Sequence, residues 1–204
     1  MRIDRFDLPD GLADALQAAY AAPPRAYHHF GHVREVLRHY DDVAAGPGWS
    51  QPREVGLAVL YHDAIYQAGR GDNEARSADL AREHLERWLP DAGIDADRVA
   101  DLILLTARHG QHAPQDFPAD AAGDDTRHFL DCDMAILGAA PDAFDAYDRA
   151  IAEEYRGVVP AWLYRRKRRS FLRGLLASER IYLGDFHHAR LEARARENLA
   201  RATG

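Results

Sequence analysis

The sequence predicts an all-α fold of eight or nine helices in one helical bundle. Apolar residues recur at helical spacing along most of the chain, as at Leu12, Leu16 and Tyr20, whereas the alternation of a half-buried strand is missing. Proline and glycine fall where helices would end, as at 46–48. The 204 residues, 47% of them hydrophobic, suffice for one core of ordinary size.

The N-terminal half contains four predicted helices. The first ends before Pro23-Pro24, because proline cannot continue a helix. The second spans about 27–43. The third, about 55–66, is apolar almost all round, which indicates a buried central helix. Asp72 can cap the fourth, which ends near Trp88.

The C-terminal half contains the remaining helices and the longest irregular stretch. Residues 110–125 form that stretch, which is either a lid over a site or a plain surface loop. Gly138 stands where a helix C-terminus favours glycine. We expect the helices of about 141–204 to pack on the rest of the chain. The expected helices span about 97–109, 126–137, 141–156, 160–177 and 185–202.

Composition excludes several classes of protein. The formal net charge of −7 provides no general attraction for nucleic acid, so we expect no nucleic-acid partner. The basic run 165–169 is an exception, either a solvated helix face or a phosphate-attracting patch beside an active site. We expect no membrane partner, since no stretch of about 18 uncharged apolar residues occurs. A charged N-terminus and one cysteine, Cys132, favour a cytoplasmic location.

The first break in the helical pattern is the pair His62-Asp63, which interrupts the most apolar predicted helix. A buried aspartate requires a cation, a hydrogen-bond network or a proton. Functional sites are where a sequence is expected to depart from its own pattern. The pair is therefore a candidate site, although a His-Asp dipeptide alone is usually a coincidence.

Other polar residues inside apolar helices can join this pair. His28 and His32 are four residues apart and are expected on one helix face. His109 ends the fifth predicted helix, and Asp131 and Asp133 lie in the sixth. Each alone is more often a hydrogen-bonded core residue than a ligand. Together they form a mixed nitrogen and oxygen set, which suits Mn²⁺, Fe²⁺, Co²⁺, Ni²⁺ or Zn²⁺.

Five segments that contain these residues form a specific set in a fixed order. They are Tyr27–Val33, Tyr61–Tyr66, Asp72–Ala78, Thr106–His109 and Phe129–Gly138, and similarity continues through Glu154-Tyr155 to Ala195–Leu199. In these segments the chain resembles the HD-domain metal-dependent phosphohydrolases, more narrowly a bacterial branch of predicted HD phosphohydrolases. The resemblance implies one HD-type helical domain over residues 1–204.

The resemblance also implies a ligand set for a divalent metal ion, which could be Mn, Mg, Fe, Co, Ni or Zn. His32 is the first ligand, His62 and Asp63 are the central pair, and Asp133 is the last. Asp131 is the alternative last ligand. Asp133 is preferred because the family's ligand usually precedes the hydrophobic end of that helix.

The number of metal ions depends on the next helices. HD proteins with two metals usually add a histidine where this chain has Asn73-Glu74, so the asparagine indicates one tightly bound metal. His84 could replace that histidine, although we expect it to face solvent. His109 matches a later position and could contact the substrate phosphate, or a weak second metal through Glu74.

The resemblance suggests roles in hydrolysis. Asp63 would accept a proton from the attacking water, with Glu74 as the second candidate base. The segment around His28 also resembles cyclic-nucleotide phosphodiesterases, in which the equivalent histidine protonates the leaving oxygen. His28 or His109 would thus act as the acid. Arg25 would clamp the phosphate, or is a plain surface residue.

Three functional hypotheses follow from the sequence. The first is hydrolysis of a phosphate ester of a nucleotide or small phosphorylated metabolite by metal-activated water. The second is a diiron oxygenase of the HD type, which needs two irons and is disfavoured by Asn73. The third is a non-catalytic, metal-containing nucleotide-binding or sensor protein, which would bind metal without turnover.

Overall fold

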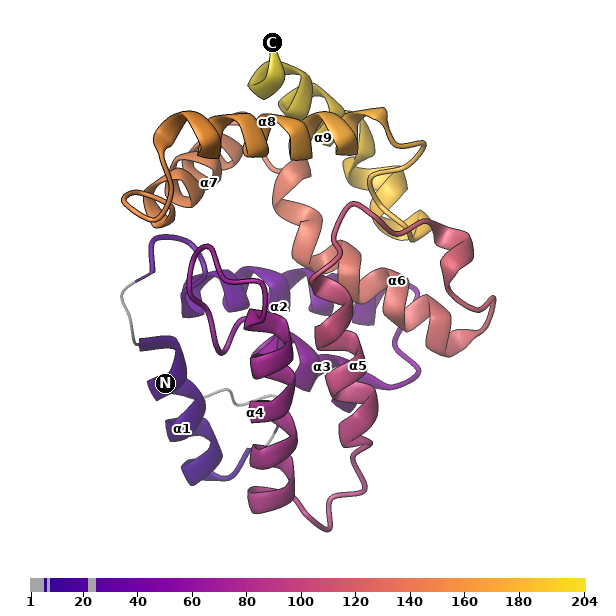
Figure 1. The fold of residues 1–204 in the computed structure, drawn as a ribbon. Coiled ribbons are helices and arrows are strands. Elements are labelled where there is room, and N and C mark those ends of the chain that lie inside the picture. The colour runs from indigo at the N-terminus through magenta and orange to yellow at the C-terminus, as the bar shows by residue number, and fades with distance from the viewer. Residues whose placement is uncertain (1–5, 7, 22–24) are drawn as a thin grey trace.

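The computed structural model describes residues 6, 8–21 and 25–204, and within them the chain forms nine α-helices, two short 3₁₀-helices and no strand (Figure 1). This confirms the predicted all-α fold. In the described part no helix is long and apolar enough to cross a membrane. The elements are α1 (Asp10–Ala21), α2 (Phe30–Ala45), α3 (Pro52–Tyr61), α4 (Asn73–Trp88), α5 (Ala96–Thr106), η1 (Pro114–Asp116), α6 (Ala121–Met134), η2 (Ala135–Gly138), α7 (Pro141–Glu154), α8 (Ala161–Ala177) and α9 (Asp185–Thr203).

The start of α2 differs from the prediction. The helix begins at Phe30, because His29 has an extended backbone and its Nδ1 accepts a hydrogen bond from Gly31 N, as an N-cap does. His28 therefore lies in the turn before the helix and not on its face. Pro23-Pro24, the predicted stop of the first helix, lies outside the described residues, and α1 ends at Ala21.

The end of α3 also differs. The helix stops at Tyr61, so His62 and Asp63 lie in the turn that follows it and not within it. The carbonyl oxygens of Asp63 and Ala64 accept hydrogen bonds from the Arg25 guanidinium, at 2.6 and 3.0 Å. These carbonyl oxygens accept from a side chain that is distant in sequence and not from the backbone of a continuing helix.

Two further helix ends were misplaced. The sixth helix begins at Ala121, earlier than predicted, because the Asp120 carboxylate accepts a hydrogen bond from Gly123 N and caps it. The irregular stretch is thus shorter than expected, and it contains η1. Helix α5 ends at Thr106, which leaves His109 in the turn beyond it.

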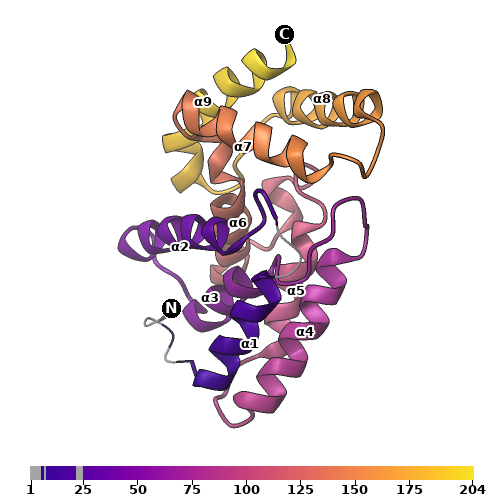
Figure 2. The same ribbon diagram turned by 90° about the vertical axis from the view of Figure 1, so that its left-hand side faces the viewer.

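The core consists of two apolar clusters. The larger one surrounds α3, in which every residue of Val55–Tyr61 is buried, as predicted for a central helix. The smaller one joins η2 to helices α7, α8 and α9. Helices α7 to α9 form a layer at one end of the α1–α6 bundle, and α6 runs from the bundle toward that layer (Figures 1 and 2).

Gly138 is where α9 approaches η2 most closely. A Cβ atom on Gly138 would lie 2.7 Å from Leu191 Cβ and 2.9 Å from both Leu191 O and the Tyr182 hydroxyl. Beside it, Asn198 Nδ2 donates to the carbonyl oxygens of Leu137 and Ala139, both at 2.9 Å. Glycine is therefore required here by close packing.

We expect Gly138→Ala to lower the free energy of unfolding by about 1–3 kcal/mol, because the added methyl overpacks the contact between η2 and α9. Gly174→Ala is the matched control: this glycine lies inside α8 with open space around it, and alanine there should raise the free energy of unfolding by about 0.5–1 kcal/mol. Urea unfolding measures both. Equal effects in the two variants would contradict the packing argument.

Candidate metal centre

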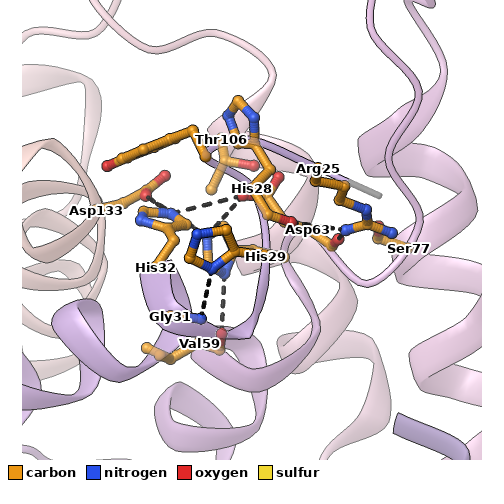
Figure 3. A network of polar contacts seen from close by, with 12 residues as sticks. Arg25, His28, His29, Gly31, His32, Val59, Asp63, Ser77, Thr106 and Asp133 are labelled. Atoms are coloured by element: carbon orange, nitrogen blue, oxygen red, sulfur yellow. Dashed lines mark hydrogen bonds and ion pairs between the residues drawn. The ribbon is translucent and has the colours of Figure 1, made fainter. Parts of the chain in front are cut away.

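Four side chains from three elements converge on one point. His32 comes from the first turn of α2, His62 and Asp63 from the turn after α3, and Asp133 from the end of α6. Figure 3 shows His32, Asp63 and Asp133 pointing toward one another. His32 Nε2 lies 3.1 Å from His62 Nε2, 2.9 Å from Asp133 Oδ1 and 3.6 Å from Asp63 Oδ2. His62 Nε2 lies 3.2 Å from Asp63 Oδ2 and 3.5 Å from Asp133 Oδ1.

The hydrogen bond of His62 to the backbone fixes the polarity of this group. His62 Nδ1 lies 2.9 Å from the carbonyl oxygen of Val59, which can only accept, so Nδ1 carries the proton. In the neutral ring, Nε2 then presents a lone pair. With both rings neutral, His32 Nε2 is the one possible donor among the four converging atoms, and three acceptors face it. The group is short of positive charge.

A divalent cation fits this group. Separations of 2.9–3.6 Å are those of atoms that share a metal ion at about 2.1 Å. Two imidazoles and two carboxylates suit Mn²⁺, Fe²⁺, Co²⁺, Ni²⁺ or Zn²⁺. His32, His62 and Asp63 lie close enough together to hold a metal ion, and Asp133 lies beside both histidines.

The electrostatics of the group follow from the same contacts. Burial opposes protonation of His62, but Asp63 and Asp133 raise its pKa well above the ordinary value. Burial opposes the ionisation of Asp63 and Asp133, but His62 lowers the pKa of each. The two carboxylates therefore favour a positive charge at His62 Nε2, where a proton and a metal ion would compete.

The other oxygen of Asp133 is held by His109. His109 Nε2 lies 2.7 Å from Asp133 Oδ2, and the imidazole is partly exposed. Such a contact orients a ligating carboxylate from outside the ligand set. The structure thus brings His109 to the site, as the sequence suggested. Its contact there is a hydrogen bond to Asp133, a candidate metal ligand.

A second dyad, between His28 and Glu154, lies beside the four candidate ligands. His28 Nδ1 lies 2.6 Å from Glu154 Oε2, and Glu154 Oε1 accepts the backbone N–H groups of Tyr27 and His28 at 2.8 and 2.9 Å. The His28 ring stacks on Tyr66 with 3.9 Å between centroids, and its centroid is 6.0 Å from that of His32. The orientation of His28 is therefore fixed from both sides.

Each member of the dyad shifts the pKa of the other toward its charged form. Burial opposes protonation of His28, but the carboxylates of Asp63 and Glu154 raise its pKa. Burial also opposes ionisation of Glu154, but its hydrogen bond with His28 lowers its pKa to about 2. Glu154, the last residue of α7, belongs to the segment Glu154-Tyr155 in which the HD resemblance continues, but the sequence assigned it no role.

The group of four candidate metal ligands and the His28–Glu154 dyad open on one cavity of about 400 Å³. This cavity lies between the α1–α6 bundle and the C-terminal helices. From residues 110–125 one side chain, Gln111, lines it, so that stretch is a surface loop at its edge and not a lid. Glu74, the second candidate base, also lines it. The remaining polar and aromatic lining is formed by Tyr27, His28, His32, Asp63, Tyr66, Thr106, His109, Asp133, Tyr147, Tyr155, Arg168 and Phe171.

No known family model matches this chain, and searches of curated proteins and of solved structures also gave no match. The HD resemblance therefore remains a prediction from the sequence segments. What the structure adds is the convergence of their polar residues on one cavity.

Arg25 does not have the predicted role of a phosphate clamp. Its Nη1 donates to the carbonyl oxygens of His28 and Asp63, and its Nη2 donates to those of Ala19 and Ala64. Arg25 is also not among the residues that line the cavity. The guanidinium holds the two turns that carry the candidate site residues, because four backbone carbonyls occupy its donors.

Two residues of α4 were considered in connection with a second metal, and His84 differs from the expectation. His84 does not face solvent: it is buried, and its Nδ1 lies 2.9 Å from the Tyr61 hydroxyl, away from the cavity. Asn73 is also buried. Its side-chain oxygen accepts from Gln67 N and its amide donates to Gln67 O, both at 3.0 Å. Both ends of the amide are thus occupied by the backbone of the preceding loop.

Asp131, the alternative last ligand, lies in a different group. Its two carboxylate oxygens accept the N–H groups of Leu183 and Gly184, both at 2.7 Å, and so fix the start of α9 to α6. Asp131, His128 and His187 are buried and close enough together to hold a cation, but none of them lines the large cavity.

We expect metal binding at the centre to release a proton, since a metal ion and a proton compete for His62 Nε2. The dissociation constant for Mn²⁺ or Zn²⁺ should therefore rise as pH falls from 8 to 6, by up to about tenfold per pH unit. Calorimetric titration in buffers of different ionisation heat measures both the affinity and the proton release.

The matched variants are His62→Ala and His39→Ala. The first should abolish binding, whereas His39, which lies outside the cavity lining, should be dispensable. Binding that is independent of pH and survives His62→Ala would show that the metal binds elsewhere.

Proposed function

We propose that this protein is a metal-dependent phosphohydrolase of the HD type, which cleaves a phosphate ester of a nucleotide or another small phosphorylated metabolite. The observation that supports this most strongly is the shared cavity. Members of a group that can hold a divalent cation and a histidine paired with a carboxylate line the same open space. A metal ion and a proton donor can both serve phosphate-ester hydrolysis, and the sequence resemblance suggests the same chemistry.

His32, His62, Asp63 and Asp133 would hold the metal. A divalent cation bound there supplies Lewis acidity, which polarises a phosphoryl group and makes water a better nucleophile. The protein contributes the position of each ligand. His62 is fixed by Val59 O, and Asp133 by His109.

His28 would act as the general acid. Glu154 holds the ring through Nδ1, so Nε2 is the nitrogen left to donate a proton to the leaving oxygen. Burial lowers the pKa of His28, but Asp63 and Glu154 raise it above its ordinary value, which favours the protonated form that the acid role needs. Stacking on Tyr66 limits rotation of the ring.

Asp63 and Glu74 are the candidate acceptors for the proton of the attacking water. Both line the cavity, and Glu74 is half-buried at the start of α4. Because both ends of the Asn73 amide are bonded to Gln67, Asn73 does not take the place of the second-metal histidine as a ligand. This favours one tightly bound metal and a hydrolase over a diiron oxygenase.

The decisive experiment is an assay of phosphate release. The purified protein is tested with Mn²⁺, Mg²⁺, Co²⁺ and Ni²⁺ on nucleoside mono-, di- and triphosphates, cyclic nucleotides and an aryl phosphate. We expect release that requires metal and falls at least about 10³-fold in Asp63→Ala, because the metal site is lost.

His39→Ala is the control for the purification and should keep full activity. Metal-loaded protein that releases no phosphate from any compound would contradict the proposal and favour the sensor or oxygenase hypothesis. Release that persists in Asp63→Ala would identify a contaminating phosphatase.

The acid role of His28 gives a prediction about pH. Activity should fall as pH rises through the pKa of His28, because the protonated form is the acid. Glu154→Gln removes a charge that raises this pKa, so the alkaline limb of kcat/KM should move down by about one pH unit. His28→Ala should lose about 10²–10⁴-fold in kcat.

Glu153→Gln is the matched control, since Glu153 is the adjacent residue and pairs with Arg156 on the surface. Its pH profile should match that of the unaltered protein. An unchanged alkaline limb in Glu154→Gln would exclude His28 as the acid.

A further inference from the structure

One residue of the basic run 165–169 differs from its neighbours in position. Arg165, Arg166 and Arg169 line a separate hollow on the outer surface of α8, together with Arg173. Arg168 instead lines the large cavity that holds the candidate metal ligands. The two interpretations of the run thus apply to different residues: a solvated face for most of it, and a position inside the site for Arg168.

Arg168 is held rigidly by α7. Its Nε donates to Asp148 Oδ1 at 2.9 Å, and its Cζ lies 4.9 Å from the centroid of the Tyr147 ring. The side chain is 12% exposed. Its Nη2 is buried and has no hydrogen-bond partner in the described part of the chain. A buried guanidinium nitrogen without an acceptor is costly, and Arg168 is also one of the residues that line the cavity, so an acceptor group of a bound molecule that reaches this nitrogen would lower the cost.

Arg168 and the candidate metal ligands lie at different parts of the cavity. The Tyr27 ring centroid is 4.7 Å from that of His32 and 4.7 Å from that of Tyr147, over which Arg168 lies. Two aromatic rings therefore separate His32 from Arg168 along the wall. A phosphoryl group at the metal ligands would leave Arg168 to contact another part of the same molecule.

Side chains that suit the organic body of a substrate also line this cavity. They include Tyr66, Ile151, Tyr155 and Phe171. An arginine fork pairs best with a phosphate or a carboxylate, which offer two acceptor oxygens in one plane. The cavity thus offers aromatic and aliphatic surface beside its polar groups.

We propose that Arg168 binds a second anionic group of the substrate, so that the preferred substrates are small organic phosphates with a further phosphate or carboxylate. The part of this proposal that concerns the hydrolysed phosphate rests on the proposed function. The part that concerns the second anionic group rests on Arg168 alone. Asp148 and Tyr147 act as positioning residues for the guanidinium.

The test uses one rigid series: phenyl phosphate, 4-carboxyphenyl phosphate and 1,4-phenylene bisphosphate. In Arg168→Gln, kcat/KM should fall about 10- to 100-fold for compounds with a second anion and stay within about twofold for phenyl phosphate. Comparing the last two compounds shows whether the second group is a carboxylate or a phosphate. Arg166→Gln, on the exposed side of α8, should change none of the three.

Binding without turnover separates this proposal from the proposed function. Phenylphosphonate and 4-carboxyphenylphosphonate are titrated calorimetrically into metal-loaded protein. We expect the second compound to bind at least about tenfold more tightly, an advantage that Arg168→Gln removes. If no phosphate ester is hydrolysed but this advantage is seen, the anion site stands and the hydrolase proposal fails.

Arg168→Lys keeps the charge but not the fork, and it decides the matter if Arg168→Gln does not fold. It should retain part of the preference for the second anion. An equal loss for all compounds in either variant, or no preference in the unaltered protein, would overturn the proposal and leave Arg168 a structural residue.

Discussion

The hydrogen bond from His62 Nδ1 to the carbonyl oxygen of Val59 is the constraint from which the site follows. It fixes the tautomer of a fully buried imidazole and directs the lone pair of Nε2 at three other polar atoms. Such a group is stable with a cation among its members and costly without one. The apolar packing around α3 keeps the turn after it in place, and this turn must stay fixed if the ligands are to meet.

The site is divided between two layers of the fold. The α1–α6 bundle carries the candidate metal ligands, whereas α7 and α8 contribute Glu154 and Arg168. The acidity of His28 and the selectivity proposed for the cavity therefore depend on how the C-terminal helices dock. Buried polar contacts hold that docking, such as the bonds from Leu183 N and Gly184 N to Asp131. A substitution far from the cavity can thus alter the chemistry of the site by shifting the layer formed by α7 to α9.

Arg25 and Arg168 show how context assigns a role to the same side chain. Backbone carbonyls accept from Nη1 and Nη2 of Arg25, which therefore stabilises two turns; its Nε is buried without a partner, and the side chain does not line the cavity of the candidate site. Arg168 has one carboxylate partner and retains a buried nitrogen without a partner, on a side chain that lines the cavity. The difference lies in how many acceptors the surrounding fold provides, since the two side chains are chemically identical.

The sequence by itself determined the all-α fold, the central position of α3 and the set of polar residues that meet at the site. Periodicity and its interruption at His62-Asp63 are local properties, so they could be predicted from neighbouring residues. The HD resemblance already preferred Asp133 to Asp131, and the structure has Asp133 beside His32. Tertiary structure alone decided that His84 is buried and that Glu154 contacts His28. These outcomes depend on contacts between distant segments, because packing selects which of several equivalent polar residues face one another.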